Sequence, residues 1–274
     1  MNGVNGQPTI VLSDVSKIYA SGRGGLVTAA EHCDLAIAAE EFVCIVGASG
    51  CGKSTLLYLI AGLSAPSGGR VLVDGQEVTG PNARVGMVFQ ADSVFPWLTV
   101  RKNVQFGPEM RGLPPDECRQ IAQRYIDLVG LSGSEDLLPR ELSGGMKKRV
   151  DVARAFANDP EILLMDEPFG ALDAMTKERL QIELLRIWEQ NRKTVLFVTH
   201  DLEEALMLGT RVVVMGRSPN TIRNIIDVPF ERPRDLLLKT RSEFQALRRR
   251  LWELLHANLP SDDDDDDTDA AETP

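Results

Sequence analysis

The sequence lacks an apolar run long enough to cross a lipid bilayer. A membrane-spanning helix needs roughly 18 consecutive apolar residues, and no stretch approaches that length. The first residues also lack the charged and apolar regions of a secretory leader. We therefore expect a soluble protein. Its 274 residues, 43% of them hydrophobic, suffice for one α/β core with a subdomain.

Cysteine and histidine are scarce and unpatterned. The four cysteines, Cys33, Cys44, Cys51 and Cys118, show no paired metal-binding spacing. Their scatter is typical of a protein from a reducing compartment. With only three histidines in the chain, we expect no structural zinc site.

A basic surface is also missing. The formal net charge is −10, but residues 261–274 contain six consecutive aspartates, Asp269 and Glu272, so the rest of the chain is nearly neutral. Neither this balance nor any long basic stripe supports nucleic-acid binding. We expect residues 259–274 to form a solvated, disordered acidic tail. The alternative is a regulatory arm that competes for basic residues such as Lys147, Lys148 and Arg149.

Residues 47–54 fit the pattern G-x-x-x-x-G-K-[ST]. The apolar run 42–46 before them predicts a buried strand, and residues 55–60 predict the first turns of a helix. Such a loop presents backbone N–H groups to phosphate, Lys53 adds a cation, and the Ser54 hydroxyl can bind Mg²⁺. A plain glycine-rich turn is the alternative, which the strand–loop–helix context disfavours. The predicted nucleotide contacts are Gly47, Ala48, Ser49, Gly50, Cys51, Gly52, Lys53, Ser54 and Thr55.

Two carboxylates follow a second apolar run. Residues 162–165 predict a buried parallel strand, whose carboxyl end is a usual ligand position. Asp166 is then placed to face the Mg²⁺ on Ser54, and Glu167 to orient and polarise the attacking water. The alternative is that the two acids only mark a solvated strand end.

A second anion site precedes this strand. Ser143 is a good N-cap for a helix over residues 146–156, and Gly144 and Gly145 leave its first N–H groups open. One triphosphate does not need two such sites in one chain. A dimer with nucleotide at its interface does.

With these motifs the sequence resembles the nucleotide-binding subunits of ABC transporters, over roughly residues 10–228. The family's motifs occur in its order: the Walker A loop, a Q-loop glutamine, the signature at 142–145, Walker B, the D-loop at 171–173 and a switch histidine. The resemblance implies that Gln90 reaches Mg²⁺ or water, that His200 contacts the γ-phosphate, and that Tyr19 stacks on adenine. It also implies that Asp173 reaches the partner's Walker A loop. Met146 replaces the family's common glutamine and resembles the nitrate, sulfonate and taurine importer group.

The expected fold is α/β: a RecA-like P-loop NTPase core with an antiparallel β-subdomain and an inserted α-helical subdomain. We expect a flexible arm over 1–9, the ATPase domain over 10–235 with its helical subdomain at about 91–157, an amphipathic helix over 236–258, and the acidic tail. Runs near 10–12, 70–73 and 85–89 are predicted to be the strands of the antiparallel subdomain.

The resemblance implies an ATPase with ATP and Mg²⁺ that drives an importer of a small oxyanion or organic sulfonate. Its implied partners are a second copy of the chain, two transmembrane permease subunits that contact residues 90–100, and indirectly an extracytoplasmic solute-binding protein. The implied location is peripheral, at the cytoplasmic face of the inner membrane. The alternatives are a lipid-trafficking ABC transporter or, less favoured by the single cassette and short insert, a non-transport ABC ATPase in DNA repair or translation.

Overall fold

Two sheets form the framework of the protein in the computed structural model, which describes residues 8–20, 25–216 and 222–256. The smaller sheet is antiparallel, in the order β2-β1-β4-β5. The larger has the order β10-β9-β3-β8-β7-β6 and is parallel except for β10. The strands are β1 (Ile10–Ala20), β2 (Leu26–Ile37), β3 (Phe42–Gly47), β4 (Gly68–Val73), β5 (Gln76–Glu77), β6 (Val85–Val88), β7 (Ile162–Asp166), β8 (Thr194–Val198), β9 (Arg211–Met215) and β10 (Ile222–Asp227).

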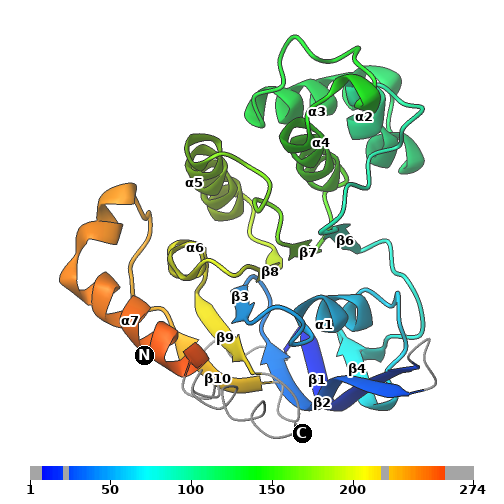
Figure 1. The fold of residues 1–274 in the computed structure, drawn as a ribbon. Coiled ribbons are helices and arrows are strands. Elements are labelled where there is room, and N and C mark those ends of the chain that lie inside the picture. The colour runs from blue at the N-terminus through cyan, green and yellow to red at the C-terminus, as the bar shows by residue number, and fades with distance from the viewer. Residues whose placement is uncertain (1–7, 21–24, 217–221, 257–274) are drawn as a thin grey trace, which may run out of the picture.

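The helices fall into three groups (Figure 1). Helix α1 follows the loop after β3, while α2, α3 and α4 pack on one another in a separate group. Helices α5, α6 and α7 lie beside the parallel sheet, on the side opposite to α1. The bounds are α1 (Lys53–Ile60), α2 (Val100–Met110), α3 (Pro115–Leu128), α4 (Gly144–Ala157), α5 (Ala174–Gln190), α6 (Leu202–Leu208) and α7 (Ser242–His256), with 3₁₀ turns at Pro139–Glu141 and Leu236–Thr240.

Three of the parallel strands are buried along their whole length. Strands β3, β7 and β8 contain only buried residues, as expected for a parallel sheet covered on both faces. Because the carboxyl ends of parallel strands meet at one edge, the segments after β3, β6, β7 and β8 share that edge. The predicted strands at 42–46 and 162–165 are therefore confirmed, and they position the site.

Three sequence expectations differ from the structure. The strand near 85–89 belongs to the parallel sheet, where β6 pairs with β7, and not to the antiparallel subdomain. That subdomain instead contains β2, which the sequence analysis missed. The helix expected over 236–258 is interrupted, because Arg241 has extended backbone angles between the 3₁₀ turn and α7.

The expected arm and acidic tail fall mainly outside the described residues, which exclude 1–7 and 257–274. Across the described part of the chain, no helix combines the length and the apolar character required to span a membrane.

Candidate functional site

The loop between β3 and α1 has the geometry of a phosphate cradle. Gly52 caps α1 with a φ of 96°, and a Cβ there would lie 2.0 Å from the carbonyl oxygen of Ala29. A Cβ on Gly47 would lie 2.6 Å from Sγ of Cys51. Both positions therefore require glycine. Lys53 is almost fully buried, and its Nζ donates to the carbonyl oxygens of Gly47 (2.8 Å) and Ala48 (2.9 Å), which holds the ammonium over the loop.

Asp166 ends β7 at the same edge. The residue is 1% exposed, and neither carboxylate oxygen has a hydrogen-bond partner. Burial raises the pKa of Asp166, and Glu167 adds to the rise, while the nearby Ser54 hydroxyl, Lys148 and Lys53 oppose it. A buried carboxylate without partners is costly. A cation bound beside Ser54 would satisfy it, so this pair of residues fits Mg²⁺.

Glu167 has a backbone conformation that is uncommon for a residue with a side chain. Its φ is 45°, in the left-handed region, and its N–H donates to the carbonyl oxygen of Val198 at 3.0 Å. Strained backbone of this kind occurs most often at functional sites. Oε2 of Glu167 lies 3.3 Å from Nδ1 of His200, which follows β8 on the next strand. The structure thus brings two predicted catalytic side chains together.

The signature segment forms a capped helix terminus. Ser143 is the N-cap of α4, and its side chain accepts a hydrogen bond from the Met146 N–H at 3.3 Å. Ser143 and Gly144 are both exposed. Their open side can therefore receive an anion presented by another molecule.

Lys148 lies beside the site, although the sequence analysis did not include it there. It is 2% exposed, and its Nζ donates to the carbonyl oxygens of Phe89 and Gln90. It thereby ties α4 to the segment after β6, and burial lowers its pKa. Arg149 donates to the carbonyls of Val129 and Gly130. The suggested basic surface at 147–149 is therefore largely occupied within the fold, and nothing in the sequence pattern signals that a lysine is buried here.

Three other predicted residues lie on other segments of the chain. Gln90 is exposed, two residues beyond β6. Tyr19 lies near the end of β1 with Nζ of Lys17 4.9 Å from its ring centroid, and it is 37% exposed. Asp173 is the N-cap of α5, accepting from the Thr176 N–H at 3.0 Å, and this backbone hydrogen bond lowers its pKa. Its exposed side chain already has a local partner.

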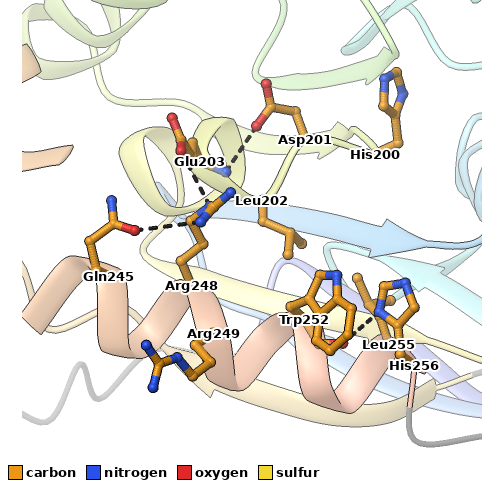
Figure 2. Close-up of a pocket in the computed structure, with 10 residues that line it drawn as sticks. All are labelled: His200, Asp201, Leu202, Glu203, Gln245, Arg248, Arg249, Trp252, Leu255 and His256. Carbon is orange, nitrogen blue, oxygen red and sulfur yellow. Dashed lines mark hydrogen bonds and ion pairs between the residues drawn. The ribbon is translucent and has the colours of Figure 1, made fainter.

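A cavity of about 710 Å³ lies next to His200, between α6 and α7. Figure 2 shows Asp201 and Glu203 on one wall, with Arg248 directed toward Glu203 across it. Trp252 and His256 line the other wall, and their rings stack with centroids 4.2 Å apart. The sequence analysis did not anticipate this cavity, because it depends on the packing of α7 against α6.

Comparison with known proteins agrees with this geometry. The family model described as "ABC transporter" matches residues 30–170. An uncharacterized ABC transporter ATP-binding protein of Methanocaldococcus jannaschii is 49% identical, over 89% of this chain and 90% of its own. The nitrate import ATP-binding protein NrtD of Synechocystis is 48% identical over 85% of this chain and 88% of its own.

Relatives named for sulfur compounds match at similar levels. The taurine import ATP-binding protein TauB of Roseobacter denitrificans is 42% identical, covering 80% of this chain and 82% of its own. The aliphatic sulfonates import protein SsuB of Bacillus thuringiensis is 41% identical, covering 92% and 98%. The predicted resemblance to the nitrate, sulfonate and taurine group is confirmed.

A solved structure supports the fold assignment. The ATP-binding cassette MJ0796, in a dimeric post-hydrolysis state bound to ADP and Pi, is 31% identical with a TM-score of 0.73. The match covers 81% of this chain and all of that one. The predicted fold, a P-loop core with an antiparallel sheet and a helical subdomain, is confirmed.

Proposed function

Because the chain belongs to the ABC transporter family, whose ATP-binding proteins hydrolyse ATP, we propose that it is the ATPase subunit of an importer for a small oxyanion or organic sulfonate. The proposed ATPase activity rests on one observation, the shared edge of the parallel sheet. There the phosphate loop, the buried Asp166 and the pair of Glu167 and His200 follow neighbouring strands.

Each residue has a role that its environment supports. Lys53 exchanges its bonds to loop carbonyls for phosphate oxygens. Glu167 orients the attacking water and accepts its proton, and His200 holds that carboxylate and contacts the γ-phosphate. The left-handed backbone of Glu167 supports this role, because strain of this kind occurs most often at functional sites. Tyr19 stacks on the adenine.

Mg²⁺ fits this site. Within the described ranges no group of three His, Cys, Asp or Glu side chains is placed to hold a metal by itself. Mg²⁺ usually takes one or two protein oxygens and completes its shell with phosphate and water. Asp166, the Ser54 hydroxyl and the Gln90 amide are the proposed ligands, and the bound ion neutralises charge on the phosphates.

Two copies of the chain complete the site. The exposed N-terminus of α4, with Ser143, Gly144 and Gly145, binds the γ-phosphate held by the partner copy, and Asp173 reaches the partner's phosphate loop. The dimeric state of the ATP-binding cassette MJ0796 supports a dimer here.

Each of the two permease subunits docks on one copy of the chain, at the groove between the helical group and the parallel sheet. This groove, of about 660 Å³, is lined by Met87, Phe95, Phe106 and Met110 among others. The ring of Trp97 lies 5.7 Å from that of Phe95. Trp97 is 72% exposed and Met110 is 69% exposed. Large exposed apolar side chains of this kind favour a protein partner. Such docking places the chain at the cytoplasmic face of the inner membrane, and a solute-binding protein delivers the substrate to the permeases.

The solute class is tested by growth of the host organism after disruption of the gene. We expect growth to be lost with one of nitrate, taurine or an alkanesulfonate as the only source of nitrogen or sulfur. The parental gene should restore it and Glu167→Gln should not, while growth on ammonium and sulfate stays normal. Unchanged growth on all these sources would contradict the proposal. If outer-membrane permeability changed instead, the lipid-trafficking alternative would replace it.

A further inference from the structure

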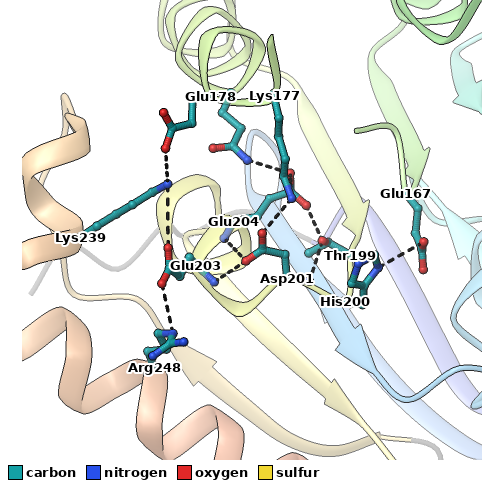
Figure 3. A network of polar contacts seen from close by, with 11 residues as sticks. Glu167, Lys177, Glu178, Thr199, His200, Asp201, Glu203, Glu204, Lys239 and Arg248 are labelled. Atoms are coloured by element: carbon teal, nitrogen blue, oxygen red, sulfur yellow. Dashed lines mark hydrogen bonds and ion pairs between the residues drawn. The ribbon is translucent and has the colours of Figure 1, made fainter. Parts of the chain in front are cut away.

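Two lysines join α5 to α6 beside His200, and they contact different carboxylates (Figure 3). Nζ of Lys177, in the first turn of α5, lies 2.8 Å from Oδ2 of Asp201 and 3.7 Å from Oε1 of Glu204. The side chain of Lys177 is only 20% exposed. Partly buried pairs of this kind are screened less by salt than surface pairs.

Glu204 connects this contact to the segment before His200. The residue is 3% exposed, and its carboxylate accepts hydrogen bonds from Nε2 of Gln181 (2.9 Å) and from the Thr199 hydroxyl. Burial raises the pKa of Glu204. Removing one partner of such a buried group usually costs more than the contact itself contributes, because the other partners stay buried.

Asp201 connects the same contact to the segment after His200. Oδ1 of Asp201 caps α6 by accepting from the N–H groups of Glu203 and Glu204. The Asp201 N–H donates to the Thr199 hydroxyl oxygen at 3.0 Å. The residues on both sides of His200 are therefore held by one network that ends on Lys177.

His200 itself depends on this support. Its side chain is 67% exposed, and its ring contacts Glu167 at 3.3 Å. An exposed imidazole has little packing to fix it, so its backbone must do so. Lys177 also lies one turn from Asp173, the N-cap of α5, which the proposed dimer uses.

We propose that Lys177 is a positioning residue for hydrolysis: it fixes the backbone around His200 and couples the position of the imidazole to the start of α5. The inference rests on the proposed roles of Glu167 and His200. It assigns no contact between Lys177 and nucleotide.

Lys239 provides a matched control. It also bridges the two helices, with Nζ 3.1 Å from Oε1 of Glu178 and 3.9 Å from Oε2 of Glu203. Its side chain is likewise 20% exposed. Its carboxylate partners are Glu178 and Glu203, and Arg248 of α7 joins the latter at 3.2 Å. Lys239 thus tests the packing of α5, α6 and α7 without touching the residues that flank His200.

The test compares Lys177→Met, Lys239→Met and Lys177→Arg in the full chain. We expect Lys177→Met to lower the kcat for ATP about 10- to 100-fold, because small displacements of a catalytic group carry penalties of this size. The KM for ATP should stay within about twofold, since the phosphate loop is untouched. Lys239→Met should keep kcat within about twofold, and Lys177→Arg should recover most of the parental rate.

A spectroscopic readout separates positioning from general loss of stability. The chain has three histidines, so the imidazole NMR signals of His200 can be assigned by comparison with His200→Gln. Those signals should shift or broaden in Lys177→Met and stay parental in Lys239→Met. If Lys177→Met does not fold, Asp201→Asn keeps the helix cap while weakening the ion pair, and the same losses should appear.

Three outcomes are informative. Parental kcat and His200 signals in a folded Lys177→Met or Asp201→Asn would overturn the proposal, and so would an equal loss of kcat in Lys239→Met. An error in the proposed roles of Glu167 and His200 can be told apart from an error about Lys177. In that case Glu167→Gln and His200→Gln would hydrolyse ATP at the parental rate.

Discussion

Asp166 and Asp151 are both buried aspartates, but their surroundings differ. Asp151 accepts hydrogen bonds from the N–H and hydroxyl of Ser93 at 2.9 Å and pairs with Arg154 at 2.9 Å. Neither oxygen of Asp166 has such a partner. Burial raises the pKa of both carboxyls. Asp151 therefore stabilises the fold, while the burial of Asp166 carries a cost that the proposed Mg²⁺ would offset.

This contrast gives a prediction for the nucleotide-free chain in mildly alkaline buffer. Asp166→Asn should raise the free energy of unfolding by about 1 kcal/mol, because it removes a buried charge whose desolvation outweighs the opposing effects of Ser54, Lys148 and Lys53. Asp151→Asn should lower it by about 3 kcal/mol, because Arg154 loses its buried partner. Urea denaturation of both variants measures the difference. An Asp166→Asn protein less stable than its parent would show that the carboxylate has partners in the folded chain.

At the scale of elements, the loop before α2 presents Trp97 on a fixed support. The side chain of Asn103, which is fully buried, donates to the carbonyl oxygens of Phe95, Leu98 and Thr99. The rings of Phe95 and Trp97 lie 5.7 Å apart. Phe95 is half-buried, because it also packs on Phe106 at 4.7 Å. Trp97 is therefore the exposed anchor of this surface.

Trp97→Ala should weaken co-purification with the permease subunits at least about tenfold, since a buried interface tryptophan commonly contributes about 2 kcal/mol or more. ATP binding by the isolated chain should not change. Trp252→Ala is the control, because Trp252 is also exposed (54%) but lies on α7. Equal recovery of the permeases with Trp97→Ala and the parent would remove this loop from the interface.

At the scale of the whole molecule, local signals were predictable from sequence and long-range pairings were not. The phosphate loop and the cap at Ser143 depend on residues within a few positions of one another, so their patterns sufficed. The partner of β6 is β7, far along the chain, and the strand was therefore assigned to the wrong sheet. The break at Arg241 has no glycine or proline to signal it. The proximity of Lys148 to Gln90 and of Lys177 to Asp201 likewise depends on tertiary packing.

The central claim concerns the dimer, in which Glu167 acts on water while Ser143 of the other copy holds the phosphate. Glu167→Gln should slow hydrolysis about 10²- to 10⁴-fold, because the amide keeps the shape of the side chain but is not a base. Binding should survive, since the phosphate loop and Lys53 are unchanged. Two chains should then remain closed over two ATP molecules.

Size-exclusion chromatography of Glu167→Gln with ATP, and separately with ADP, tests this account most directly. A dimer should appear with ATP and be absent with ADP. Adding Ser143→Arg should abolish it, because the arginine side chain fills the site for the partner's phosphate. A double variant that still dimerises with ATP, or a Glu167→Gln protein that hydrolyses ATP at the parental rate, would contradict the account.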